Sequence, residues 1–238
     1  DPLALARARG LLPVGAHGAA AFAARADELE PFLAEARQHA ATTSRAVDVE
    51  VDGVRLVGEI DGVGQHHVLR LRVAKLKPKD TLRGWLVHLL AAAQSAEDAA
   101  RGLPPWPTRT RLLARDGAFE FLEVTPDDAR RWLSFFVAHR RLGLSRPLPW
   151  FEHASHALGE ALHKGRGPVE ALRNARRAFL REEHGANFGS PGDAEDPDVA
   201  LCWRDRDPFE GGSDSELYRL ADAAWRPALS FRHEDRDA

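Results

Sequence analysis

The sequence predicts an α/β or α+β fold in which a mixed sheet is flanked by helices. Alternation of apolar and polar residues, typical of strands, is concentrated in the first half of the chain, where Asp-Gly pairs at 52–53 and 116–117 mark two hairpin turns. Amphipathic helical spacing dominates the second half. With 238 residues, we expect one domain, with a core at about 17–142 and a helical and loop extension at about 143–238.

The first half begins with a helix and a hairpin. Apolar residues near one face predict a helix over residues 17–40, and Pro31 within it predicts a kink or a break, because proline removes a helical hydrogen bond. Residues 47–51 alternate strictly between apolar and polar, and the alternation resumes at 54–56 after the Asp52-Gly53 turn. These two runs are therefore expected to pair as antiparallel strands.

The middle of the chain repeats this alternation of helix and hairpin. Amphipathic spacing predicts a helix over 78–95, for which Asp80 is the expected N-cap. A second hairpin is expected over 109–124. Thr125 then caps a helix that reaches Leu142, since a proline and two acids follow it in the first turn.

The extension is expected to be mainly helical. The predicted elements are helices at about 153–163 and 168–183, a surface loop at 185–198, a short apolar strand or helical turn at 199–203, and a final helix to residue 229 that begins with a capping box at 213–216. The last seven residues are charged, and we expect them to fray.

Composition excludes several classes of site. The net charge is -3, so any binding of nucleic acid must come from a local basic patch. A single cysteine, Cys202, excludes an internal disulfide and a zinc cluster built on cysteines, suits a reducing cytoplasm, and is expected in the core. No apolar run approaches a membrane span and no signal peptide is visible. Because the chain begins at Asp1-Pro2 and contains no Met, we interpret it as a fragment of a longer protein.

The stretch from residue 54 to 79 has the layout of a metal-dependent nuclease core. In that layout an Asp that ends one strand and an acidic residue on the next strand hold a divalent cation, which prefers oxygen ligands. Asp61 occupies the first position, and the strand expected at 68–74 offers cations and no carboxylate. Asp61 is either a residual metal ligand or a turn residue that caps the backbone of Gly62 or Gly64. Recruitment of a distant acid, such as Glu28 or Glu35, remains open.

Six cations within fourteen residues form the strongest candidate binding site. They are Arg70, Arg72, Lys75, Lys77, Lys79 and Arg83, and Asp80 is the acid among them. Where these side chains share a face they would contact DNA phosphates, and Arg would also stack on a splayed base. The alternative is a solvated face whose cations form salt bridges with acidic helices.

Other candidate sites are weaker. His66 and His67 are adjacent, so on a strand their rings would point to opposite faces; a turn location is favoured for the pair, and a zinc site with His88 is not expected. His153 and His156 lie one helical turn apart, and a solvent-facing helix is favoured there over a metal site. Two aromatic residues in a proline-rich loop, Trp150 and Phe151, are the candidates for a protein interface. The sequence has neither a G-x-S-x-G motif nor a phosphate-binding G-x-x-x-x-G-K-[ST] motif.

Several segments resemble the C-terminal domain of RecC, the gamma subunit of exodeoxyribonuclease V. They are ARGLLP at 8–13 followed by Gly15 and Gly18, LVGEI at 56–60, RVAKLK at 72–77, WLVHL at 85–89, PLPWF at 147–151 and DRDPF at 205–209. None is a sharp catalytic motif, and their order and spacing together carry the resemblance.

This resemblance implies a fold and a function. The implied fold is a degenerate restriction-endonuclease-like (PD-(D/E)XK) core without catalytic residues. The implied function is a non-catalytic scaffold in a cytoplasmic DNA repair complex that contacts a RecD-like subunit and DNA near the point of strand separation, with a RecB-like subunit as a further partner. Mg and ATP are used by the partner subunits of the family and no cofactor is expected in this domain, although an active metal-dependent nuclease with a relocated carboxylate is the alternative.

Overall fold

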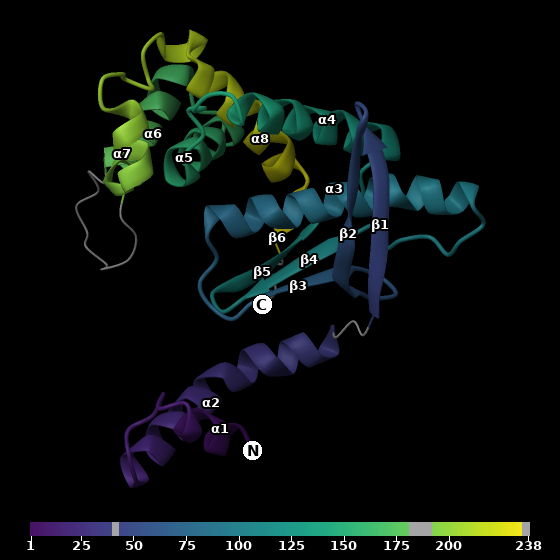
Figure 1. Ribbon diagram of the computed structural model, residues 1–238, viewed down its shortest axis with the longest axis vertical. Coiled ribbons are helices and arrows are strands. Elements are labelled where there is room, and N and C mark those ends of the chain that lie inside the picture. Colours follow the sequence, from purple (N-terminus) through teal and green to yellow (C-terminus); the bar gives the residue numbers. More distant parts are fainter. Residues whose placement is uncertain (40–42, 181–191, 235–238) are drawn as a thin grey trace.

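The computed structural model describes residues 1–39, 43–180 and 192–234 (Figure 1). Its helices are α1 (Pro2–Ala8), α2 (Ala16–Gln38), α3 (Pro78–Ala100), α4 (Pro126–Gly143), α5 (Glu152–His163), α6 (Pro168–Leu180), α7 (Pro197–Trp203) and α8 (Glu216–Ser230). Its strands are β1 (Thr43–Val51), β2 (Val54–Val63), β3 (Val68–Arg72), β4 (Thr110–Ala114), β5 (Gly117–Phe121) and β6 (Arg232–Glu234). The predicted α/β fold with a mixed sheet and flanking helices is confirmed.

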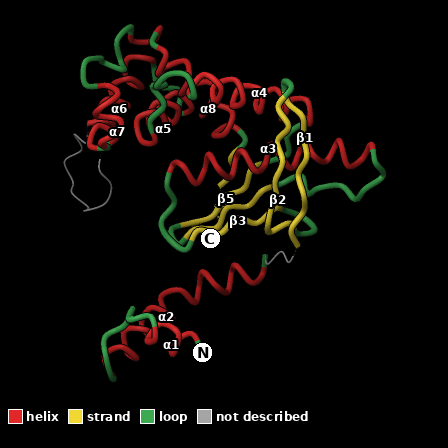
Figure 2. The backbone as a smooth tube through the Cα atoms, viewed as in Figure 1, coloured by secondary structure: helices red, strands yellow, loops and turns green. Residues whose placement is uncertain are grey.

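The strands form one sheet in the order β1-β2-β3-β4-β5-β6. Among the described strands, only β3 and β4 pair in parallel, and α3 makes the crossover between them. β2 and β3 share the single pair Val63 and Val68, so the β1–β2 hairpin diverges from the rest of the sheet, as Figure 2 shows. The Asp52-Gly53 tip of the hairpin reaches α4, where the hydroxyl of Ser134 donates to the Asp52 carboxylate.

Helix α3 covers one face of the sheet. Trp85 and Leu89 are fully buried there against strand residues that include Val68, Leu112 and Phe121. Gly84 permits the close approach, because a Cβ at that position would lie 2.5 Å from Leu112 Cδ1. Burial of these large apolar side chains is the main stabilising contribution in this half of the chain.

The C-terminal half of α2 covers the opposite face. Phe32 and Ala36 pack against Leu69 and Leu113, which alternate along β3 and β4 with the residues that face α3. The first half of α2 and α1 extend away from the sheet (Figure 1). The helix is continuous from Ala16 to Gln38, so the break considered at Pro31 does not occur.

The second half of the chain forms a helical cluster from α5, α6 and α8. Leu158, Leu217 and Trp225 are almost fully buried in it, and Gly159 lets α5 approach the Cβ of Trp225. Helix α8 also contributes Ala228 to the apolar cluster between α3 and the sheet, and it leads directly into β6. The two clusters are therefore joined through α8.

Several local predictions at the C-terminal end were wrong. Of the last seven residues, which were expected to fray, Arg232–Glu234 instead pair with β5 as an edge strand, and residues 235–238 lie outside the described residues. The cap of α8 is Ser215, whose hydroxyl accepts from the amide of Tyr218, so the capping box does not begin at Ser213. The apolar run 199–203, expected as a strand or a helical turn, is helical; its helix α7 begins at Pro197, so the predicted loop ends earlier than residue 198. Residues 185–191 of that loop lie outside the described residues, whereas 192–196 are described.

Two further findings concern Cys202 and the apolar character of the helices. Cys202 is exposed, contrary to its expected place in the core, because α7 presents it to solvent. Across the described ranges, no helix combines the length and apolar character needed to cross a bilayer.

Candidate nucleic-acid interface

The six predicted cations lie along one connection of the fold. Arg70 and Arg72 are the middle and last residues of β3, Lys75 and Lys77 lie in the following turn, and Lys79 and Arg83 lie one turn apart at the start of α3. We call these six residues the basic strip. Arg70 and Arg72 share a strand face with Val68, which packs toward α3, so the strand directs both arginines to the side that the helix occupies.

Two carboxylates hold the turn that carries the basic strip. The Asp80 carboxylate accepts from the amide of Lys77 at 3.1 Å, and the Asp116 carboxylate accepts from the amide of Leu76 at 2.9 Å. Lys77 is the N-cap of α3 and Asp80 is its third residue, which corrects the prediction that Asp80 itself caps the helix. An acid in this position also complements the positive end of the helix dipole.

The cations of the basic strip differ in whether they have ionic partners. Arg72 Nε lies 3.1 Å from the Asp80 carboxylate, and Lys79 Nζ lies 3.4 Å from Glu152 on α5. Four cations form no ion pair within the described part of the chain: Arg70, Lys75, Lys77 and Arg83. The fold thus brings two acids, Asp116 and Glu152, to a segment whose own sequence contains only Asp80, and it still leaves most of the cations unpaired.

Asp61 lies in β2 at a bulge. Three steps of β2, from Ile60 to Val63, oppose two steps of β1, and Gly62 adopts a positive φ of 78°. A Cβ at Gly62 would collide with the carbonyl oxygen of Leu69, so only glycine allows β3 to approach here. The Asp61 side chain is exposed, and Ser44 Oγ donates to it at 2.5 Å. Asp61 is therefore a strand residue that binds the neighbouring strand, in contrast to the turn cap considered from the sequence.

The two distant acids considered as replacements have arginine partners. Glu28 pairs with Arg115 and Arg25, and Glu35 lies 2.9 Å from the guanidinium of Arg111. Arg111 is only 7% exposed and fixes α2 to the sheet through this contact. Within residues 1–39, 43–180 and 192–234, no group of three or more His, Cys, Asp or Glu side chains is arranged to hold a metal ion.

The histidines considered as metal ligands have structural partners. His88 is 2% exposed, hydrogen bonded to Thr110 Oγ1 at 3.1 Å and to the Leu122 carbonyl at 2.9 Å, and burial lowers its pKa to about 4. Burial also lowers the pKa of His67, which lies 3.4 Å from the His39 carbonyl. The expected solvent-facing position of His156 is wrong, since its ring packs against Trp225 with centroids 4.7 Å apart, and burial lowers its pKa.

The Trp150-Phe151 segment leads from the proline-rich loop into α5. Phe151 is 3% exposed and packs against Phe179 and Trp203, so its side chain belongs to the helical cluster rather than to an exposed surface. Trp150 is half-buried next to Phe135 and Phe136. A partner interface at this loop stays a prediction, and Trp150 is the residue of the pair that could reach it.

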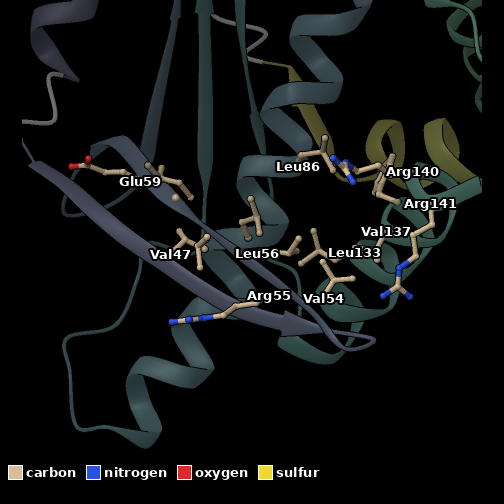
Figure 3. A pocket seen from close by; sticks show the side chains of 15 residues that line it. Val47, Val54, Arg55, Leu56, Glu59, Leu86, Leu133, Val137, Arg140 and Arg141 are labelled. Atoms are coloured by element: carbon tan, nitrogen blue, oxygen red, sulfur yellow. The ribbon is translucent and has the colours of Figure 1, made fainter. Parts of the chain in front are cut away.

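A groove that the sequence did not indicate lies between the β1–β2 hairpin and helices α3 and α4. Its volume is about 590 Å³, and Figure 3 shows its lining side chains. The floor is apolar, with Leu86, Leu90, Leu133, Phe136 and Val137 from the two helices. Arg55, Arg140 and Arg141 form the charged margin together with Glu59. No local motif marks these residues, because the hairpin and α4 meet only in the tertiary structure.

Comparison with known proteins gives two matches. The family model described as the RecC C-terminal domain matches residues 1–163. The RecBCD enzyme subunit RecC of Escherichia coli (strain K12) is 25% identical over an alignment of 213 residues, and the match covers 85% of this chain and 18% of that protein. The chain thus spans less than a fifth of the length of this relative.

Proposed function

We propose, since this chain belongs to the RecC C-terminal domain family, that it is a non-catalytic scaffold domain of a RecBCD-type helicase–nuclease. Such a complex has exodeoxyribonuclease V activity and acts in repair of double-strand breaks and homologous recombination. In this proposal the domain contacts a RecD-like subunit and a RecB-like subunit, and it touches DNA near the point where the strands separate. Its sheet and helices would then correspond to a restriction-endonuclease-like core that has lost its active site.

The basic strip is the observation that supports DNA contact. Four of its six cations have no ionic partner within the described residues, so they can exchange water and counterions for phosphates without first breaking an ion pair. The turn beneath them is fixed by Asp80 and Asp116, so binding does not require the backbone to become ordered.

Charge reversal tests this proposal. The four unpaired cations, Arg70, Lys75, Lys77 and Arg83, are changed to Glu in the complete subunit, which is then assembled with its partner subunits. Binding to forked duplex DNA should weaken by about 100-fold or more at low salt, and the slope of log affinity against log salt should decrease by about 0.9 for each phosphate that the variant no longer neutralises.

A matched variant controls for total charge. Four exposed arginines in the second half of the chain make no ion pair in its described part: Arg173 and Arg177 on α6, Arg206 between α7 and α8, and Arg219 on α8. Changing these to Glu alters the net charge equally and should leave binding within about twofold of the wild type. Equal weakening in the two variants would show that the basic strip is not where DNA binds.

The carboxylate geometry supports the absence of turnover in this domain. Asp61 bonds Ser44, and the distant acids Glu28 and Glu35 pair with arginines, so none of them is placed to share a cation in a two-metal phosphodiester cleavage. The complete subunit alone should not degrade linear DNA in Mg²⁺ or Mn²⁺. Cleavage that disappears in the Asp61→Ala variant would instead identify an active nuclease with a relocated carboxylate.

A further inference from the structure

The edge of β2 that faces away from β1 has no strand partner along the groove. β2 pairs with β1 on one side from Val54 to Val63. On the other side, the described residues give it a single partner, Val68 opposite Val63, so the backbone groups from Val54 to Gly62 have no neighbouring strand. A free strand edge of this kind presents a row of amide donors and carbonyl acceptors that can pair with another chain.

The groove follows this edge and leaves room for another backbone. All residues from 54 to 60 line it, including Arg55, Val57 and Glu59, which alternate with residues of the opposite strand face. A cavity that meets both faces of one strand must run along its edge. Gly58 lies in the middle, and a Cβ built there would meet no atom within 4 Å. A glycine inside a strand is typical of a site that another backbone approaches closely.

The side chains around the groove define the chemistry of an occupant. The helical floor is apolar, and Val57 is 65% exposed, so the occupant needs apolar side chains at alternate positions. Arg140 and Arg141 lie together at the α4 end, and Glu59 lies at the far end (Figure 3). Arg140 forms no ion pair in the described part of the chain, whereas Arg55 is engaged by Asp48 through two hydrogen bonds.

We propose that this groove binds an extended segment of a partner subunit, which adds as a strand to the free edge of β2. The segment carries apolar residues at alternate positions and at least one carboxylate, which meets Arg140 and Arg141. Main-chain hydrogen bonds supply affinity, and the apolar floor and the arginines supply specificity and direction. The inference rests on the proposed function, because it names the chemistry by which this domain holds a subunit of the helicase–nuclease.

Photo-crosslinking in the assembled complex tests the occupant directly. A photoreactive amino acid replaces Val57 in the complete subunit, and a matched variant carries it at Val169, which is 74% exposed on α6 and outside the groove. The Val57 variant should give an adduct with one partner subunit, and mass spectrometry should locate it in an extended apolar segment with an acidic residue. The Val169 variant should not label that segment.

Two pairs of variants test the mode of binding. Gly58→Leu fills the groove, and Gly167→Leu is its control, because a Cβ at either glycine meets nothing within 4 Å and both residues are exposed. Arg140→Glu reverses the charge at the α4 end, and Arg173→Glu is the matched reversal on α6. Gly58→Leu and Arg140→Glu should each weaken binding of the crosslinked subunit by about tenfold or more, and the controls by less than about twofold.

The outcomes separate this inference from the function on which it rests. If the wild-type complete subunit binds no helicase or nuclease subunit, the proposed function fails. If the complex assembles and the Val57 adduct lies within the same chain or on DNA, or if Gly58→Leu and Arg140→Glu bind as tightly as their controls, the groove inference alone is overturned. Circular dichroism of the Gly58→Leu variant should match the wild type. If its spectrum differs, the Arg140→Glu variant alone decides the test, because it alters only an exposed side chain.

Discussion

The two ends of helix α3 are attached to the molecule in different ways. At the C-terminal end, Asp98 is 5% exposed and accepts hydrogen bonds from Arg45, Gln94 and Trp106, each at 2.7 Å. At the N-terminal end, Asp80 accepts from the Lys77 amide and pairs with Arg72, whose side chain is 34% exposed. At the first end the Asp98 carboxylate is buried and shared by three donors, whereas at the second end half of the basic strip, Lys75, Lys79 and Arg83, is exposed to solvent.

The two ends of α3 therefore differ in role: one contributes mainly to stability, and the other is available for binding. Arg45 also donates to the carbonyls of Pro104 and Pro105 and lies 4.4 Å over the Trp106 ring, so the Asp98 network joins β1, α3 and the following loop. A buried network of this kind has no free group left for a ligand. The N-terminal end contributes less to stability, and its cations keep the solvent access that phosphate binding requires.

The largest effect is expected from Asp98→Ala. Removing the carboxylate leaves Gln94, Trp106 and the Arg45 guanidinium without their shared acceptor in a buried site, and loss of one partner from such a site costs about 3–5 kcal/mol. We therefore expect the free energy of unfolding to fall by that amount, measured by urea denaturation.

The same variant also has a pH signature. Although burial opposes it, the hydrogen bonds from Gln94 and Trp106 and the charge of Arg45 hold the pKa of Asp98 below its ordinary value of 3.8. Its stabilising contribution is thus present above pH 3.8 and is lost as the pH falls through the lower folded pKa. A loss below about 1 kcal/mol at neutral pH would contradict the description of this end as the rigid attachment.

His88, in the middle of α3, should make stability depend on pH. Burial lowers its pKa from 6.5 in the unfolded chain to about 4 in the fold. Between these values the unfolded state binds a proton that the folded state does not, so stability should fall by about 3 kcal/mol as the pH drops from 6.5 to 4. His67 and His156 act in the same direction, so the difference between the profiles of the wild type and of His88→Gln isolates this contribution. Parallel profiles would show that His88 titrates normally.

The contrast also explains which features the sequence could predict. The Asp52-Gly53 turn and the Thr125 cap were predicted correctly because their chemistry lies within four residues. The pair of Lys79 with Glu152 and the pair of Arg45 with Asp98 were not predicted, because each joins elements far apart in the chain. Strand β6 was missed for the same reason: Arg232, His233 and Glu234 form a strand only because α8 delivers them to the edge of β5.

The two candidate sites also differ in how far the sequence could predict them. The cations of the basic strip are close together in the chain, so composition alone located them, and their pairing could not be predicted since Asp116 and Glu152 come from other elements. The groove gave no sequence signal, because Gly58 is an ordinary strand residue until the divergence of β2 from β3 exposes its edge. A charged surface built from residues close together in the chain can therefore be located from the sequence, whereas an apolar groove formed by distant elements cannot.

A smaller effect is expected from Asp80→Ala. This variant removes a helix-capping hydrogen bond and a partly exposed ion pair, which together stabilise the fold by about 1–2 kcal/mol. It also frees Arg72 from its partner, so DNA binding by the assembled complex should be unchanged or a few times tighter at low salt. A loss of stability equal to that of Asp98→Ala would remove the distinction between the two ends of α3.

The smallest effect is expected from Lys75→Ala. Lys75 is exposed in the turn after β3 and has no ionic partner in the described ranges, so its removal should leave the free energy of unfolding within about 0.5 kcal/mol of the wild type. If it contacts one phosphate, the salt slope of DNA binding should decrease by about 0.9 with no change in sequence preference. Lys164→Ala is the control, because Lys164 is also exposed but pairs with Glu160 on α5. An unchanged slope for Lys75→Ala would place the phosphate path elsewhere on the basic strip, since a free cation in contact with DNA must release counterions.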